Sequence, residues 1–329
     1  MANSQNSADL LRDALGLVGE LPDGSSDYTA LALKFLNDAY LAVLAGSNEF
    51  QLDIGEPWVF ARNSTPKSFV LLPAYSDGTV SLTNASAAGT FSSAPSASLG
   101  SFANRYIKVN DRASYYQITE HVAGASAFTL DRAYLEATGG TLAFTAIPLI
   151  YNLGSGILRL VEPFRVFGNT RGVSGMADDD GRIYGIPLNN LREQWPLQYI
   201  RSGMPNRFAT YRRDDNSWYV MVNAYPDEPT KVDFDCIDIP AGLTDSDSSV
   251  PLIPREFRKV LSYGAAYFLS IKKEASDEKK QELLALTQAK LKAMMKAEMK
   301  ETTVAGKDKG RLFPRQEELR NGGRLRGYY

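Results

Sequence analysis

Three aspartates close together in one alternating segment are the best candidates for acid–base chemistry. Asp233, Asp235 and Asp238 lie in a run that alternates polar and apolar residues, which is typical of a β-strand. Asp233 and Asp235 are two positions apart, so they share one face of that strand. Two carboxylates in one cleft could hydrolyse a glycan. The flanking residues, however, give no sign of the apolar setting in which a carboxyl group acts as an acid.

Few other residues suggest chemistry. His121 is the single histidine, which excludes histidine-rich metal sites, and its place at a strand end predicts a solvated surface side chain. Cys236, the single cysteine, alternates with apolar residues and is predicted to be a small core residue rather than a nucleophile. The aspartates at 178–180 lack the spacing of a calcium loop, and 168–175 lacks the lysine of a phosphate loop. We therefore predict no catalytic residue, no metal and no cofactor.

Composition narrows the class of protein. The net charge of −2 argues against a general nucleic-acid binder, which is usually basic. One cysteine excludes an internal disulfide, so folding needs no oxidising compartment. The first residues have neither the basic region nor the apolar run of a signal peptide, and no window is long and apolar enough to span a membrane. These features predict a soluble protein made in a cytoplasm.

The last segment, 301–329, has no periodicity and holds seven basic residues against three acidic ones over 302–329. Arginine and aromatic residues are typical interface anchors, so we predict an arm that becomes ordered on a partner. Its contact residues are Arg311, Phe313, Arg315, Arg320, Arg324, Leu325, Arg326, Tyr328 and Tyr329. Contact with nucleic-acid phosphates and a plain solvated tail remain the alternatives.

Helical periodicity is clearest near both ends of the chain. In 250–300, apolar residues recur at three- and four-residue steps in two consecutive runs, which predicts a helical hairpin opened by Pro254. Ser276 is the expected N-cap of its second helix. A helix over 7–17 and a longer one, capped by Ser26 or Asp27 and stopped by Gly46, are expected within 1–50. We therefore predict an α+β fold with a helical core built from both chain ends.

Between these helices the sequence predicts strands. Within 51–76, residues 58–60 and 69–72 read as short strands. Residues 77–140 alternate in short segments separated by turn dipeptides, which predicts an inserted antiparallel barrel or sandwich of about five strands, with a mobile loop at 85–100. Residues 141–249 are expected to form a mixed β-region with one short helix. Pro163 within 158–167 argues for an edge strand or a bulge.

Three segments of the second half occur in an informative order. Gly-Met-Pro-Asn-Arg-Phe at 203–208 precedes a strand pair, Tyr-Pro-Asp at 225–227 forms a turn, and Ile-Pro-Arg-Glu-Phe at 253–257 opens the helix pair. Together with Leu-Asn-Asp-Ala-Tyr at 36–40, they give a chain that resembles the head-to-tail adaptor (connector) proteins of tailed bacteriophages. The segments 105–107 and 115–118 resemble an insertion common in phage structural proteins.

The resemblance implies a structural virion protein at the neck of the particle. Such adaptors form a ring, usually of twelve copies, that binds below the portal, extends the DNA channel and offers the tail a docking platform. The resemblance also implies that the C-terminal arm binds the portal and that genomic DNA passes through the ring without sequence-specific binding. The inserted β-domain would face tail or fibre proteins.

A rival function is that of a tail-associated protein that binds or hydrolyses glycans. Hydrolysis would use Asp233 and Asp235, which must then lie in one cleft roughly 5–9.5 Å apart. A ring adaptor needs no such cleft, so the geometry around the two aspartates discriminates between the two functions.

Overall fold

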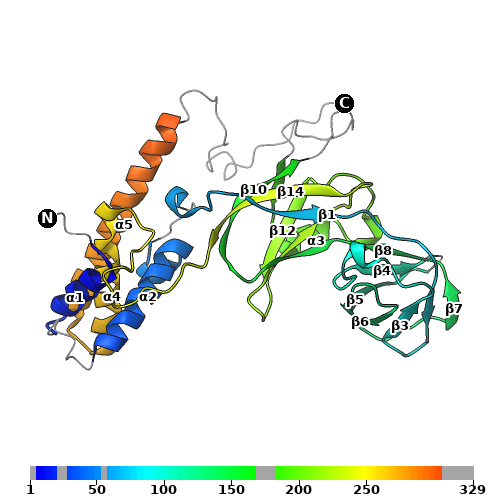
Figure 1. Cartoon of the computed structure of the whole chain (residues 1–329), viewed down its shortest axis with the longest axis horizontal. Helices are drawn as coiled ribbons and strands as arrows, with labels where there is room; N and C mark the ends of the chain where they lie inside the picture. Colours follow the sequence, from blue (N-terminus) through cyan, green and yellow to red (C-terminus); the bar gives the residue numbers. More distant parts are fainter. Residues whose placement is uncertain (1–4, 21–27, 53–57, 111, 168–181, 306–329) are drawn as a thin grey trace. The chain divides into compact units, whose positions relative to one another are not determined.

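The computed structural model describes residues 5–20, 28–52, 58–110, 112–167 and 182–305. The chain divides into two units (Figure 1). One unit joins Met1–Arg62 to Pro240–Tyr329, and the other comprises Asn63–Ile239. Among the described residues there are five α-helices and fourteen strands. None of the described helices has a stretch long and apolar enough to cross a membrane.

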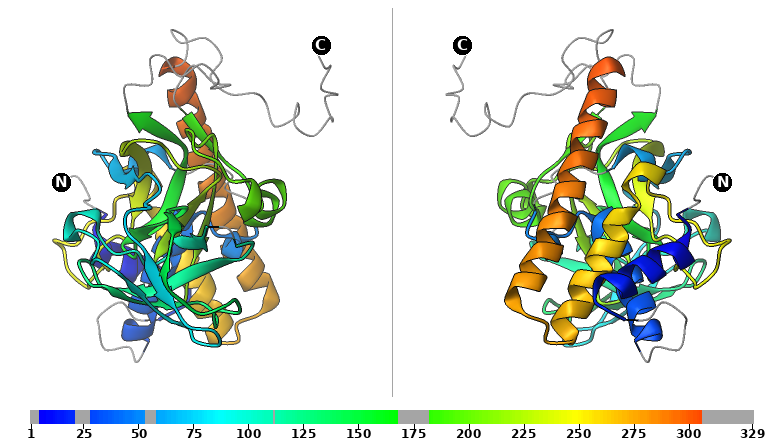
Figure 2. Two further views of the ribbon diagram at one scale, coloured as in Figure 1. Left: turned by 90° about the vertical axis from the view of Figure 1, so that its right-hand side faces the viewer. Right: turned by 90° about the vertical axis from the view of Figure 1, so that its left-hand side faces the viewer.

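The first unit is helical, and its central element is α4 (Lys259–Lys272). This helix packs against α1 (Ser7–Leu17), α2 (Thr29–Ala45) and α5 (Asp277–Ala305) (Figure 1). Figure 2 shows α5 running beside α4 and continuing past its end. Because α4 has helices on several sides, it is buried over most of its surface, as its buried residues show: Val260, Leu261, Ser262, Gly264, Ala265, Ala266, Leu269 and Ser270.

The sequence signals located these helices well. The helix over 7–17 is confirmed, and Gly46 ends α2 in the left-handed conformation (φ 67°). Ser276 Oγ accepts a hydrogen bond from the Lys279 N–H, as an N-cap should. Two details differ: α2 begins at Thr29, and a 3₁₀ turn over Arg255–Phe257 stands between Pro254 and α4.

Gly264 lets α4 approach its neighbours closely. A Cβ atom at this position would lie 2.9 Å from the Phe50 ring and 3.1 Å from the Ala39 Cβ. Such distances are shorter than van der Waals contact, so a side chain here would push α4 away from α2 and Phe50.

We predict that Gly264→Ala lowers the free energy of unfolding by roughly 1–2 kcal/mol, because overpacking outweighs the better helix propensity of alanine. The control is Gly16→Ala in α1, where a Cβ would meet nothing within 4 Å. That variant should be neutral or more stable by up to about 1 kcal/mol. Urea unfolding followed by far-ultraviolet circular dichroism measures both. Equal effects at the two positions would contradict close packing at Gly264.

The second unit contains two seven-stranded sheets. The first has the order β1-β14-β10-β11-β12-β13-β9 and is antiparallel except between β11 and β12. Its strands are β1 (Lys67–Leu71), β9 (Ile150–Gly154), β10 (Ile157–Phe167), β11 (Arg182–Gly185), β12 (Arg207–Arg212), β13 (Trp218–Val222) and β14 (Thr230–Asp238). The two outer strands approach each other, since Tyr151 on β9 packs on Phe69 of β1 and accepts a hydrogen bond from the Leu72 N–H.

One face of this first sheet buries apolar and aromatic side chains. Phe164 stacks on Phe208 with ring centroids 4.1 Å apart and also contacts Phe234. On the opposite face, Leu191 of α3 (Leu188–Gln194) packs with Ala209 and Met221. The short helix expected within 141–249 is therefore confirmed, and strands β12, β13 and β14 lie in the same segment, which was expected to be a mixed β-region.

The second sheet closes into a small barrel. Its order is β7-β2-β3-β6-β5-β4-β8, and its end strands β7 (Gly139–Leu142) and β8 (Phe144–Ile147) are separated in sequence only by Ala143. One continuous segment therefore pairs with both β2 and β4. The remaining strands are β2 (Val80–Leu82), β3 (Ala88–Phe91), β4 (Tyr106–Val109), β5 (Tyr115–His121) and β6 (Ala127–Leu130).

The barrel corrects the sequence analysis in two respects. It has seven strand segments rather than about five and extends to Ile147, beyond the expected boundary at 140. The stretch 85–100, predicted as a mobile loop from its small polar residues, contains strand β3. Gly89 on β3 lies against Phe128, where a Cβ atom would be only 2.4 Å from the ring. Small residues there make room for the aromatic core of the barrel.

The expected fold class, an α+β fold organised around a helical core built from both chain ends, is wrong. The described residues form two near-closed sheets of seven strands each in addition to five helices. The strands are not additions to a helical core, because they enclose apolar cores of their own. The strand expected at 58–60 is also wrong. Residues Val59–Ala61 form a 3₁₀ turn, held where the buried Trp58 Nε1 donates to the Val43 carbonyl oxygen at 2.6 Å.

Candidate functional site

The predicted contact residues of the C-terminal arm all lie outside the described residues. They are Arg311, Phe313, Arg315, Arg320, Arg324, Leu325, Arg326, Tyr328 and Tyr329, and the described chain ends with α5 at Ala305. The aspartates at 178–180 and the glycine-containing run 168–175 are outside it as well. The structure does, however, show what holds the helix that leads to the arm.

Helix α5 is attached to the helical unit along most of its described length. Its buried residues are Leu283, Thr287, Leu291 and Met294. Their apolar neighbours Leu284 and Met295 are only half-buried. Gln288 Nε2 donates to the Phe50 carbonyl oxygen at 2.9 Å. Further along, the Glu298 carboxylate accepts from the Val59 and Phe60 N–H groups at 3.0 and 3.4 Å. The arm therefore follows a helix that is held as far as Glu298.

The segment that returns from the strands to α4 is held by side chains of α2. Asn37 bonds the Leu243 backbone in both directions, with its Oδ1 2.6 Å from the Leu243 N and its Nδ2 3.0 Å from the Leu243 O. Tyr40 Oη accepts from the Leu252 N–H at 2.9 Å. Burial raises the pKa of Tyr40, so this hydroxyl stays neutral. Both residues belong to the 36–40 motif, whose role in this chain is to position the returning segment.

Helix α1 holds the same segment from its first turn. The Ser7 N–H donates to the Ser249 carbonyl oxygen at 2.9 Å, and Ser7 Oγ donates to the carbonyl oxygens of Thr244 and Ser246. Asn6 Nδ2 donates to Asp247 at 3.1 Å. An irregular segment needs partners for its backbone groups, and here two helices provide them.

We predict that Asn37→Ala destabilises the protein by about 1–3 kcal/mol, because it leaves two part-buried backbone groups of Leu243 without partners. Asn48, which is exposed just beyond α2, serves as the matched control. Asn48→Ala should change the free energy of unfolding by less than about 0.5 kcal/mol. Urea titration measures the difference, and equal stabilities of the two variants would contradict the clamp.

Two other motifs of the family resemblance lie side by side. The Gly203 N–H donates to the Tyr225 carbonyl oxygen at 2.9 Å, and Ser202 pairs with Tyr225 in a β-bridge. Gly203 has a φ of 145°, which side chains rarely adopt. Asn223 Oδ1 accepts from the Asn206 and Arg207 N–H groups and so fixes the start of β12. The structure therefore brings together the segments that flank the strand pair.

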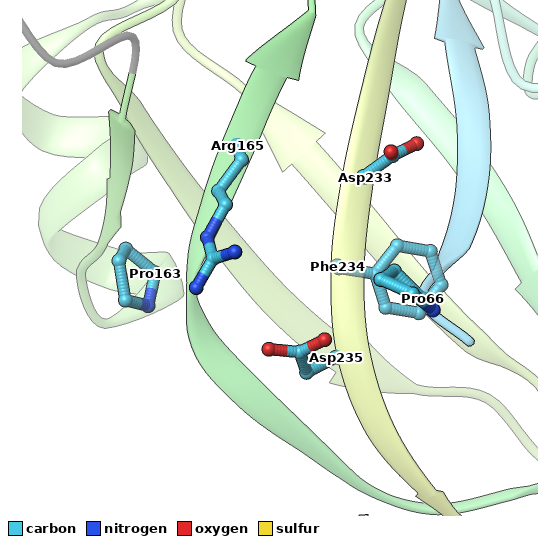
Figure 3. A pocket seen from close by; sticks show the side chains of 6 residues that line it. All are labelled: Pro66, Pro163, Arg165, Asp233, Phe234 and Asp235. Atoms are coloured by element: carbon cyan, nitrogen blue, oxygen red, sulfur yellow. The ribbon is translucent and has the colours of Figure 1, made fainter. Parts of the chain in front are cut away.

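Asp233 and Asp235 line one small hollow on the outer face of the first sheet. The remaining lining residues are Pro66, Pro163, Arg165 and Phe234. The sequence prediction that the two aspartates share a face is confirmed. Figure 3 shows the Arg165 guanidinium extending toward Asp235, whereas the Asp233 carboxylate points away from it. Arg165 had no part in the sequence analysis.

A bulge at Pro163 makes this hollow. Between the partners Val161↔Asp235 and Arg165↔Asp233, β10 has three intervening residues and β14 has one. The expected interruption is thus a bulge, and β10 is not an edge strand. Glu162 lies in the bulge with its carboxylate over Gly185, where a Cβ atom would be 2.1 Å from Oε1. Partial desolvation there raises the pKa of Glu162, although the residue as a whole is exposed.

The hollow is small for a ligand site. Its volume is about 30 Å³, room for about two water molecules. Pockets that enclose small ligands are typically about 300–1,000 Å³. Lys231 Nζ lies 3.1 Å from Asp233 Oδ1, but only its approach to Oδ2, at 3.5 Å, has hydrogen-bond geometry. Oδ1 therefore has no hydrogen bond. The hollow cannot enclose a sugar ring between the two aspartates.

The third aspartate and the cysteine have structural roles. Burial acts to raise the pKa of Asp238, but hydrogen bonds from Lys67 at 2.6 Å and Asn63 at 2.9 Å outweigh it and lower the pKa. Cys236 is fully buried, as predicted, and burial together with the Asp238 charge raises its pKa to about 11. A thiol with that pKa stays protonated near neutral pH and is a poor nucleophile.

His121 is not the solvated residue that the sequence predicts. It is 8% exposed, because β3 and the segment before β4 cover it with Phe91 and Phe102. Nothing adjacent in the sequence signals this covering, since the rings come from positions about twenty to thirty residues earlier.

Comparison with known proteins identifies no family. No family model matches the chain, and no curated protein matches it.

Proposed function

We propose that this protein is a head-to-tail adaptor of a tailed bacteriophage, which binds below the portal through its C-terminal arm. The observation that carries the proposal is the basic and aromatic segment 306–329 that directly follows α5. Since α5 is held at Gln288 and Glu298, the arm extends from a fixed origin. An arm that becomes ordered on its partner would add interface area without a large rigid patch.

The order of elements also supports the proposal. The segment at 203–208 leads into the strand pair β12–β13, Tyr225–Asp227 follows the pair, and 253–257 leads into α4 and α5. This is the order on which the resemblance to adaptors rests. The motif residues Asn37 and Gly203 have structural roles in this chain, as a scaffold protein requires.

In this proposal the chain works as a homo-oligomeric ring, with twelve copies as the expected number. Repeated arms would combine weak contacts into tight binding to the portal by avidity. The net charge of −2 suits a DNA conduit, because a strongly basic lumen would retain the moving genome. The ring would sit in the neck of the virion after synthesis in the host cytoplasm. The barrel of β2–β8 would face tail or fibre proteins.

The rival glycan function has less support. The two aspartates do lie in one hollow, but its volume of about 30 Å³ leaves no place to enclose a sugar between them. We therefore propose the adaptor as the single function.

We predict that deletion of residues 306–329 weakens binding to the portal ring of the same phage by at least about tenfold, since it removes the interface anchors. The deletion should leave the melting temperature unchanged, because the described packing of α5 ends before the arm. Co-sedimentation with purified portal rings measures binding.

Two matched variants separate charge from apolar contact within the arm. One replaces Arg311, Arg315, Arg320, Arg324 and Arg326 with serine, and the other replaces Phe313, Leu325, Tyr328 and Tyr329 with serine. Both variants should co-sediment less with the portal ring. Only the arginine variant should show a weaker dependence of portal binding on salt concentration. Undiminished binding by the truncated chain would refute a portal grip in the arm.

A further inference from the structure

His121, the last residue of β5, lies inside one end of the barrel. Its ring packs edge-on against Phe91, with centroids 5.7 Å apart, and against Phe102 at 5.3 Å. Both ring nitrogens are bonded to the backbone. Nδ1 is 2.9 Å from the Phe102 N, and Nε2 is 3.0 Å from the Ala125 O.

These two partners fix the protonation state of the ring. A backbone N–H can only donate and a carbonyl oxygen can only accept. Nδ1 must therefore be an acceptor and Nε2 a donor, which is the neutral imidazole with its hydrogen on Nε2. A second proton would have to sit on Nδ1, where it would face the Phe102 N–H donor and break that hydrogen bond.

The ring joins two loops that are far apart in sequence. Phe102 belongs to the segment 96–105 that precedes β4, and Ala125 belongs to the turn 122–126 between β5 and β6. Ser101 Oγ adds a hydrogen bond to the His121 carbonyl oxygen at 2.5 Å. The turn also packs on the segment, since a Cβ at Gly124 would lie 3.3 Å from the Ala97 Cβ.

The surroundings of the ring oppose a positive charge. Burial lowers the pKa of His121, the hydrogen bond to Ala125 acts in the opposite direction, and the Arg105 cation lowers the pKa further. Arg105 comes from the same segment as Phe102 and is itself 4% exposed. Strands β3 and β6 present Phe91 and Phe128, and the turn presents a carbonyl oxygen. Among the described residues, no carboxylate forms an ion pair with His121.

We propose that His121 is a pH-sensitive clamp, whose protonation on Nδ1 releases the segment 96–105 from the turn between β5 and β6. The clamped state needs the neutral ring, whereas the released state exposes a histidine with an ordinary pKa of about 6.5. The clamp is therefore closed above about pH 6.5 and opens as the pH falls below that value. Well below pH 6.5, each further fall of one pH unit raises the released population about tenfold, until the clamped ring also protonates.

Hydrogen–deuterium exchange of the full chain between about pH 7.5 and about pH 5 tests this, with rates corrected for intrinsic exchange. We expect protection of peptides covering 99–105 to fall about fivefold between about pH 6.5 and about pH 5.5, because a released histidine with a pKa of about 6.5 is already half protonated at the upper value. A peptide covering β12 and β13, in the other sheet, should keep its protection.

His121→Asn is the matched variant, because its Oδ1 can accept the Phe102 N–H in place of Nδ1 and cannot titrate in this range. Its exchange in 99–105 should be independent of pH. Unchanged protection of the wild-type segment across the pH range would overturn the proposal, and this result needs no variant. An equal loss of protection throughout the barrel would also overturn it, because release would then not be local.

Discussion

The arrangement of the helical unit depends on how the chain is held when it returns from the strands. The segment between Ile239 and α4 has no regular structure of its own, so its backbone groups need partners from elsewhere. Asn37 provides both a donor and an acceptor for Leu243, Tyr40 accepts from Leu252, and Ser7 holds the stretch between them. These bonds place the start of α4, and the small residues of α4 then let three helices pack around it. The position of α5, and so the origin of the arm, follows from that packing.

The strand-rich unit is stabilised differently. The aromatic rings of Phe164, Phe208 and Phe234 pack together in the core of the first sheet. A second aromatic cluster fills the core of the barrel. The barrel closes because one segment, β7 and β8, pairs with both β2 and β4, which leaves no long free edge between them. Polar side chains within this framework, such as the buried His121 and the partly exposed Asp238, have defined partners. They lock loops and strand ends in place.

Local sequence signals predicted the elements whose causes are local. Apolar spacing and Gly46 located α1 and the end of α2, and alternation indicated β14 and the short strands within 77–140. The signal failed where a distant residue decides the structure. A 3₁₀ turn follows Trp58 where its indole reaches Val43, and the small residues around Gly89 form a strand because Phe128 packs there. The fold class was wrong because periodicity finds helices more readily than it shows that short strands close into sheets with their own cores.

For the candidate sites, Pro163 in the sequence indicated the bulge. The position of Arg165 and the burial of His121 could not be predicted, because they depend on pairing across the sheets. The arm lies outside the described residues and stays a prediction.

We propose that the chain adds a ring to a phage portal. Electron microscopy of purified portal rings mixed with the full-length chain tests it most directly. We expect a closed ring of additional density on one face of the portal, with many copies of the chain around a central channel. Portal particles without added density, in the presence of folded chain in excess, would contradict it.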